Sequence, residues 1–240
     1  MLKKALPFFF FLFFFSAANG QSPKAAVFYR SGIEFKNKNM LPEAMVAFTK
    51  AIVLNKKYDS AYVELAIINV KTDKLDSAIF NVKKAIAINP KMTTALTTLG
   101  TIYRDSKPNY DSALYYYKAA IKIDSTNKVT FYSIAWCYNA KQVYDSAFIF
   151  SVKALDLDNN YRPAYAELAH AIYASKKFAE GIEQFKKNMA ISVVDLPIYY
   201  SGLAYTQLND KESALKQYEE LKKINEKMAA KLKKTIDGMK

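Results

Sequence analysis

The sequence predicts an all-α protein, a solenoid of about six helix pairs that ends in a capping helix. The first observation behind this fold is a small residue that opens the second helix of each pair. It recurs at intervals of 34, 35, 34, 34 and 33 residues, at Ala44, Ala78, Ala113, Ala147, Gly181 and Ala214. The second is composition: 51% of the 240 residues are hydrophobic, with only 6 glycines and 7 prolines, which leaves no low-complexity linker. One helix pair cannot bury its own apolar faces, so it needs copies of itself on either side.

The best-defined pair has large, small and aromatic residues at fixed spacing. They are Leu96, Leu99, Gly100 and Tyr103 on its first helix and Ala113, Tyr117 and Ala120 on its second. Its helices are expected to cross closely, because Gly100 and Ala113 lack bulk and large side chains surround them. The spacing resembles the tetratricopeptide repeat signature, W-x2-L-G-x2-Y followed by A-x3-F, with leucine for tryptophan and tyrosine for phenylalanine. The resemblance implies a right-handed α-solenoid.

Six units that resemble this repeat lie in register between about Ala25 and Glu226. Within one predicted domain, 21–240, they occupy 25–58, 59–92, 93–127, 128–161, 162–194 and 195–226, followed by a cap at 227–240. The third unit has one extra residue near Ser106, which predicts a surface loop insertion. In the fifth, Asn188 replaces a small apolar residue, which predicts a kink or early local opening.

The first 20 residues predict a secretory signal peptide. Lys3 and Lys4 precede an apolar run from Ala5 to Phe15, and small residues lie before a predicted cleavage after Gly20. The alternative is an uncleaved membrane anchor, although the run is shorter than the ~20 residues that span a bilayer. We therefore expect an exported bacterial protein, located in the periplasm or at the cell surface.

The last 20 residues have the pattern of an amphipathic helix. Apolar residues recur at three- and four-residue intervals from Leu221 to Ile236, and lysines occupy the other side. This favours a helix that covers the open apolar face of the last repeat, as repeat arrays require. A basic helix resting on a membrane is the alternative.

Sequence motifs for catalysis, a cofactor or a metal site are absent. His170 is the lone histidine and Cys137 the lone cysteine, so a zinc site of the usual kinds is not expected. Asp76, Asp111 and Asp145 begin second helices, where an acid caps the helix or favours its dipole. Most lysines are spread one or two per helix, which is typical of solvated faces rather than a nucleic-acid site, despite a formal net charge of +13.

The resemblance implies that a ligand lies in a concave groove lined by the first helices. The corresponding positions are Tyr29, Ile33, Val63, Ile67, Thr97, Thr101, Arg104, Tyr132, Trp136, His170, Tyr173 and Tyr199. They predict an aromatic and aliphatic groove with a hydroxyl-rich middle and Arg104 as its fixed charge. The predicted function is a non-catalytic scaffold that binds a peptide or protein segment. Two alternatives stay open: an envelope assembly subunit that binds by its convex face or ends, and a membrane-surface module that uses the basic tail.

Overall fold

The computed structural model describes residues 23–192 and 194–239. All regular structure in these residues is helical, as predicted, and consists of thirteen α-helices and one π-helix. The predicted signal peptide, 1–20, lies outside the described residues and stays a prediction.

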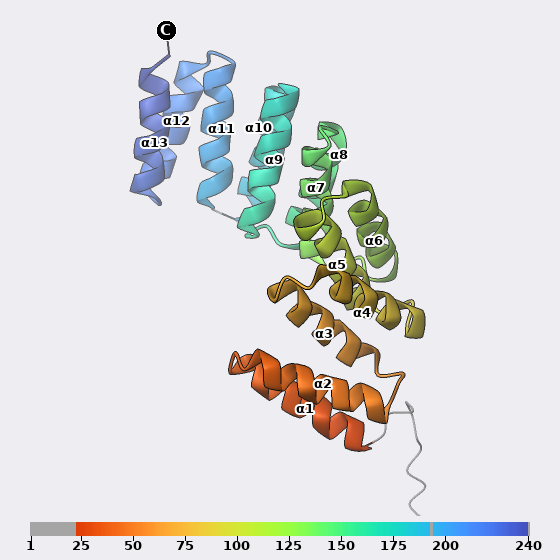
Figure 1. The fold of residues 1–240 in the computed structure, drawn as a ribbon. Helices are drawn as coiled ribbons and strands as arrows, with labels where there is room; N and C mark the ends of the chain where they lie inside the picture. The colour runs from red at the N-terminus through yellow and green to blue at the C-terminus, as the bar shows by residue number, and fades with distance from the viewer. Residues whose placement is uncertain (1–22, 193, 240) are drawn as a thin grey trace, which may run out of the picture. The chain divides into compact units, whose positions relative to one another are not determined.

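The chain separates into two compact units at the boundary between Tyr58 and Asp59. Unit 1 contains α1 (Pro23–Asn37) and α2 (Leu41–Leu54). Unit 2 contains the remaining helices, which follow one another in antiparallel pairs (Figure 1). They are α3 (Asp59–Lys71), α4 (Leu75–Ile88), α5 (Thr93–Thr101) with the π-helix η1 (Ile102–Ser106), α6 (Tyr110–Ile123), α7 (Lys128–Ala140), α8 (Tyr144–Leu157), α9 (Arg162–Ser175), α10 (Phe178–Ile191), α11 (Asp195–Gln207), α12 (Lys211–Lys222) and α13 (Glu226–Asp237). A single domain over 21–240 stays a prediction.

Small residues lie where paired helices approach each other in unit 2. Ala78, Ala113, Ala147 and Ala214 are fully buried at the starts of their helices. At Gly100, an added Cβ would lie 2.7 Å from Cε1 of Tyr117. The recurring small residues therefore permit the close crossing that their spacing predicted.

Five first helices end in the same way, on a residue with left-handed backbone. These residues, all other than glycine, are Asn39, Asp73, Gln142, Lys176 and Asn209, with φ between 56° and 60°. The amide that follows each of them donates to a carbonyl five residues earlier, as Lys74 N–H does to Asn69. This is the hydrogen bond of a Schellman end, which satisfies a free carbonyl of the last turn.

The third repeat ends its first helix differently and corrects the expectation of a loop insertion. Its extra residue is taken up by the π-helix η1, in which the amide of Lys107 donates to the carbonyl of Ile102 at 2.9 Å. Such single π-turns are frequently found at functional sites. The insertion thus changes which side chains the end of this helix presents.

Asn188 does not break the fifth repeat, contrary to the expected kink, since α10 runs unbroken through it. The side chain is buried, and its amide donates to Oδ1 of Asn159 at 2.7 Å. Asn159 in turn donates to the carbonyl of Asn188 at 3.0 Å, and the hydroxyl of Tyr165 donates to the carbonyl of Asn159. Because this buried polar group is hydrogen-bonded, it links neighbouring repeats rather than weakening them.

Replacing Asn188 by alanine is expected to lower the free energy of unfolding by about 1–2 kcal/mol, because it removes a buried donor and leaves its partners less satisfied. Urea unfolding followed by circular dichroism measures this change. The control is Asn160→Ala, at an exposed neighbouring position, which should shift stability by less than about 0.5 kcal/mol. Equal effects of the two substitutions would contradict a stabilising role for the buried amide.

The C-terminal segment is two helices rather than one that starts at Leu221. Helix α12 ends at Lys222, and the side chain of Asn225 caps α13 by accepting from the amide of Met228. Helix α13 buries Ala229, Leu232 and Ile236 in the cluster that includes Leu221. The predicted capping helix is thereby confirmed, and it starts five residues later than the apolar pattern suggested.

Candidate functional site

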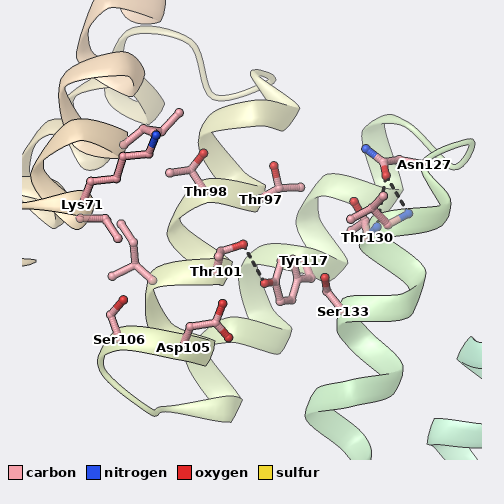
Figure 2. Close-up of a pocket in the computed structure, with 14 residues that line it drawn as sticks. Lys71, Thr97, Thr98, Thr101, Asp105, Ser106, Tyr117, Asn127, Thr130 and Ser133 are labelled. Carbon is pink, nitrogen blue, oxygen red and sulfur yellow. Dashed lines mark hydrogen bonds between the residues drawn. The ribbon is translucent and has the colours of Figure 1, made fainter. Parts of the chain in front are cut away.

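A pocket of about 400 Å³ opens among the first helices of three successive repeats in unit 2. Its walls come from α3, from α5 with η1, and from the start of α7, while Tyr117 of α6 contributes to its floor. The lining residues are Ile67, Val70, Lys71, Thr97, Thr98, Thr101, Ile102, Asp105, Ser106, Tyr117, Asn127, Val129, Thr130 and Ser133. Figure 2 shows α5 between Lys71 on one side and Asn127, Thr130 and Ser133 on the other.

Hydroxyl groups and aliphatic side chains share the lining. Thr97, Thr98 and Thr101 follow one another along α5 (Figure 2). The hydroxyl of Thr101 lies 3.0 Å from that of Tyr117, which is buried at the floor. Burial raises the pKa of Tyr117, so its hydroxyl stays neutral at physiological pH. The pocket therefore offers neutral hydrogen-bonding groups beside aliphatic side chains.

Arg104 is fixed beside the pocket rather than free within it. Its Nε and Nη2 donate to both carboxylate oxygens of Asp105, at 2.5 and 2.7 Å, and its Nη1 donates to Ser133 at 2.9 Å. The guanidinium also lies 5.6 Å from the ring of Trp136. The hydrogen bond with Asp105 raises the pKa of Arg104. Because its charge is already paired, Arg104 holds η1 against α7 and is not an open anion site.

Lys71 supplies a different kind of charge, because its side chain is exposed at the pocket edge. It forms no ion pair among the residues that the structure describes. A carboxylate on a ligand would therefore meet Lys71 before Arg104.

The structure brings together only part of the predicted groove set. Ile67, Thr97 and Thr101 line the pocket, and Arg104 lies next to it. Val63 is buried in the core of unit 2. Tyr132 and Trp136 on α7 are half-buried and contact Tyr161 and Tyr110 edge to face.

The remaining predicted residues lie elsewhere. His170 is exposed on α9, while Tyr173 and Tyr199 pack against the cores of the later repeats. Tyr29 and Ile33 belong to unit 1, where the ring of Tyr29 stacks on Tyr58.

Several pocket residues were not among the predicted positions. Asp105 and Ser106 belong to η1, so only the π-turn accounts for their place in the lining. Thr98 and Ser133 adjoin the predicted positions Thr97 and Tyr132, and Thr130 lies two residues before Tyr132. The density of threonine and serine between 93 and 133 was the available signal.

Cys137 is buried, and loss of solvation raises the pKa of its thiol to about 12, so it stays protonated. Within residues 23–192 and 194–239, no group of three or more His, Cys, Asp or Glu side chains is placed to hold a metal ion. Each helix in these residues is also too short or too polar to cross a membrane.

Comparison with known proteins gives two matches to the family model of the tetratricopeptide repeat, at residues 59–92 and 199–228. Anaphase-promoting complex subunit 3 of Schizosaccharomyces pombe is 31% identical over 98 residues, which are 41% of this chain and 15% of that protein. Small glutamine-rich tetratricopeptide repeat-containing protein 2 of Saccharomyces cerevisiae is 29% identical over 158 residues, 66% of this chain and 41% of that protein. The chain therefore spans less than half the length of these two relatives.

Solved structures share the fold. YrrB, described as a tetratricopeptide repeat protein with an unusual peptide-binding site, is 22% identical with a TM-score of 0.60, over 78% of this chain and 98% of YrrB. PilF of Pseudomonas aeruginosa is 15% identical with a TM-score of 0.64, over 90% of this chain and 99% of PilF. Proteins built from such repeats generally act as non-catalytic scaffolds that bind other proteins. Two segments of this chain thus match the tetratricopeptide repeat model, and the described helices have the fold of a solved tetratricopeptide repeat protein.

Proposed function

We propose that this protein is a non-catalytic scaffold that binds a peptide or protein segment in the pocket among α3, α5 and α7. The observation that carries this proposal is the position of the pocket, which is lined by the first helices of three successive repeats. A volume of about 400 Å³ is within the range of specific binding pockets. It has room for one or two side chains of a longer segment that continues along the neighbouring first helices.

The lining specifies the chemistry of the segment. An apolar anchor would contact Ile67, Val70 and Val129, and hydroxyls of Thr97 and Thr98 would hydrogen-bond the peptide backbone. Lys71 at the edge favours an acidic residue next to the anchor. The hydroxyl groups of the lining are neutral, so they do not select a ligand by its charge. Most of the specificity therefore comes from the shape of the pocket.

The likeness to YrrB supports the proposal by analogy, since that protein is described as having a peptide-binding site. Photosystem I assembly protein Ycf3 of Cyanophora paradoxa, 24% identical over 125 residues, is named for assembly rather than for catalysis. This likeness gives some support to the alternative function, an assembly subunit. The membrane alternative has less support, because α13 buries the apolar face that would enter lipid.

The test uses a peptide selected from a random library on the purified protein, with affinity measured by fluorescence anisotropy. Thr97→Trp puts an indole into the pocket and is expected to weaken binding at least about tenfold, or 1.4 kcal/mol. Thr94→Trp is the matched control, because Thr94 lies one turn earlier on α5, exposed and outside the lining. Equal affinities for parent and Thr97→Trp would place binding outside this pocket.

Export of the protein is proposed from the sequence alone. If the signal peptide is cleaved as expected, N-terminal sequencing of the protein from its cells reads from Gln21. A sequence that starts at Met1 would instead favour an uncleaved segment.

A further inference from the structure

The second helices α4, α6 and α8 carry a matching row of acids at their starts. Each acid pairs with the lysine that precedes the second helix of the next repeat. The pairs are Asp76 with Lys107, Asp111 with Lys141 and Asp145 with Lys177. These contacts link the start of each second helix to the turn before the next one. In Figure 1 the three helices lie on the right of unit 2, beside α3, α5 and α7.

One turn further along each helix lies an exposed apolar side chain. Phe80 is 58% exposed, Tyr115 69% and Ile149 51%. Each follows its aspartate by four residues, so it lies on the same face of its helix. In α10 and α12 the same position holds Glu183 and Lys216. Within unit 2 the apolar row is therefore confined to α4, α6 and α8.

The next turn forms a basic row of exposed lysines. Lys84, Lys118 and Lys153 lie over the rings of Phe80, Tyr138 and Phe150, with Nζ 5.4, 5.2 and 5.1 Å from the ring centroids. None of the three forms an ion pair among the residues that the structure describes. Beyond the first turns, Asp156 is the one acid on these three helices. The face thus combines exposed apolar groups with uncompensated positive charge.

We propose that this α4–α6–α8 face is a second docking surface, for an acidic protein segment with apolar side chains beside its carboxylates. The apolar side chains would cover Phe80, Tyr115 and Ile149, which gain most from removal of water. The carboxylates would pair with the basic row, whose lysines form no ion pair with the described residues. The surface uses different helix faces from the pocket, so one protein can hold two segments.

A membrane surface fits this face less well than an acidic segment does. The exposed fractions of the side chains of Asp76, Asp111 and Asp145 are 94%, 82% and 71%. They lie one turn from the apolar row, where anionic headgroups would repel their carboxylates. A polypeptide can place its apolar side chains on the apolar row and direct its carboxylates to the basic row, away from the aspartates.

The test measures anisotropy of a short fluorescein-labelled peptide of alternating glutamate and leucine, with a lysine–leucine peptide for comparison. The parent is expected to bind the glutamate peptide at least about tenfold more tightly, and added salt should weaken that binding. Phe80→Ser/Tyr115→Ser/Ile149→Ser should weaken it about tenfold or more. So should Lys84→Glu/Lys118→Glu/Lys153→Glu, with Lys→Gln at the same positions as a milder variant. Circular dichroism checks that each variant folds.

Two controls locate the effect. Glu183→Ser changes the equivalent position on α10, and Thr97→Trp blocks the pocket, so both should keep the affinity of the parent. Three results would overturn the proposal: equal binding of the two peptides, variants that bind as well as the parent, or binding to phosphatidylglycerol vesicles without binding to the glutamate peptide. The last result would assign the face to a membrane.

Discussion

Replacing Gly100 by valine is expected to lower the free energy of unfolding by about 2–3 kcal/mol. An added Cβ would lie 2.7 Å from Cε1 and 2.9 Å from Cδ1 of Tyr117. The ring cannot easily move away, since it is 1% exposed and its hydroxyl is hydrogen-bonded to Thr101. Relief of the clash must therefore separate α5 from α6. The gain in helix propensity on removing a glycine is smaller than this cost.

Urea unfolding of the parent and the valine variant measures the change. Gly238→Val is the matched control, because the nearest atoms to an added Cβ there are backbone oxygens at 3.5 and 3.7 Å. Thr101 and Tyr117 also line the pocket, so peptide binding should fall together with stability in Gly100→Val. Unchanged stability would contradict the close crossing of the two helices at this residue.

Replacing Leu232 by alanine is expected to cost about 2–5 kcal/mol of unfolding free energy. The side chain is fully buried on α13, in a cluster with Ile198, Leu221 and Ile236. It also lies so close to α11 that a Cβ added at Gly202 would be 2.5 Å from Cδ2 of Leu232. Truncation would leave a cavity between the cap and the last repeat.

The same unfolding experiment applies to Leu232→Ala, with Lys231→Ala as the control on an exposed position of the same helix. Hydrogen exchange should show that α11 and α12 lose protection before the earlier repeats, because each repeat is stabilised by its neighbours. A variant as stable as the parent would mean that α13 does not cap the array.

The repeating part of the fold could be predicted from the sequence, because its physical cause is periodic. Small residues such as Ala78, Ala113 and Ala147 recur wherever two helices cross, and the structure buries all of them. The same regularity selected Ile67, Thr97 and Thr101, which line the pocket. Both the buried small residues and these groove positions follow from a spacing that recurs in every repeat.

The other features of the fold and the pocket depend on contacts that occur at one place in the chain and do not recur in each repeat. Propensity does not distinguish a loop insertion from a π-turn, so the places of Asp105 and Ser106 were not predictable. A buried asparagine destabilises a helix packing unless a partner satisfies its amide. The partner of Asn188 is Asn159, which is 29 residues away in the sequence, so the pair could not be recognised from the sequence. Arg104 was predicted as the fixed charge of the groove, and its pairing with Asp105 depends on a side-chain conformation that the sequence does not give. Contacts of this kind require coordinates.

Binding of a polypeptide segment among α3, α5 and α7 can be tested by crosslinking. The most direct measurement places benzoylphenylalanine at the apolar anchor of the selected peptide and maps its photochemical crosslinks on the protein by mass spectrometry. If the segment binds in the pocket, crosslinks fall within residues 67–71, 97–106 and 127–133, and they are lost in Thr97→Trp and kept in Thr94→Trp. Crosslinks confined to α12 and α13, or to the outer face of α4, α6 and α8, would contradict it.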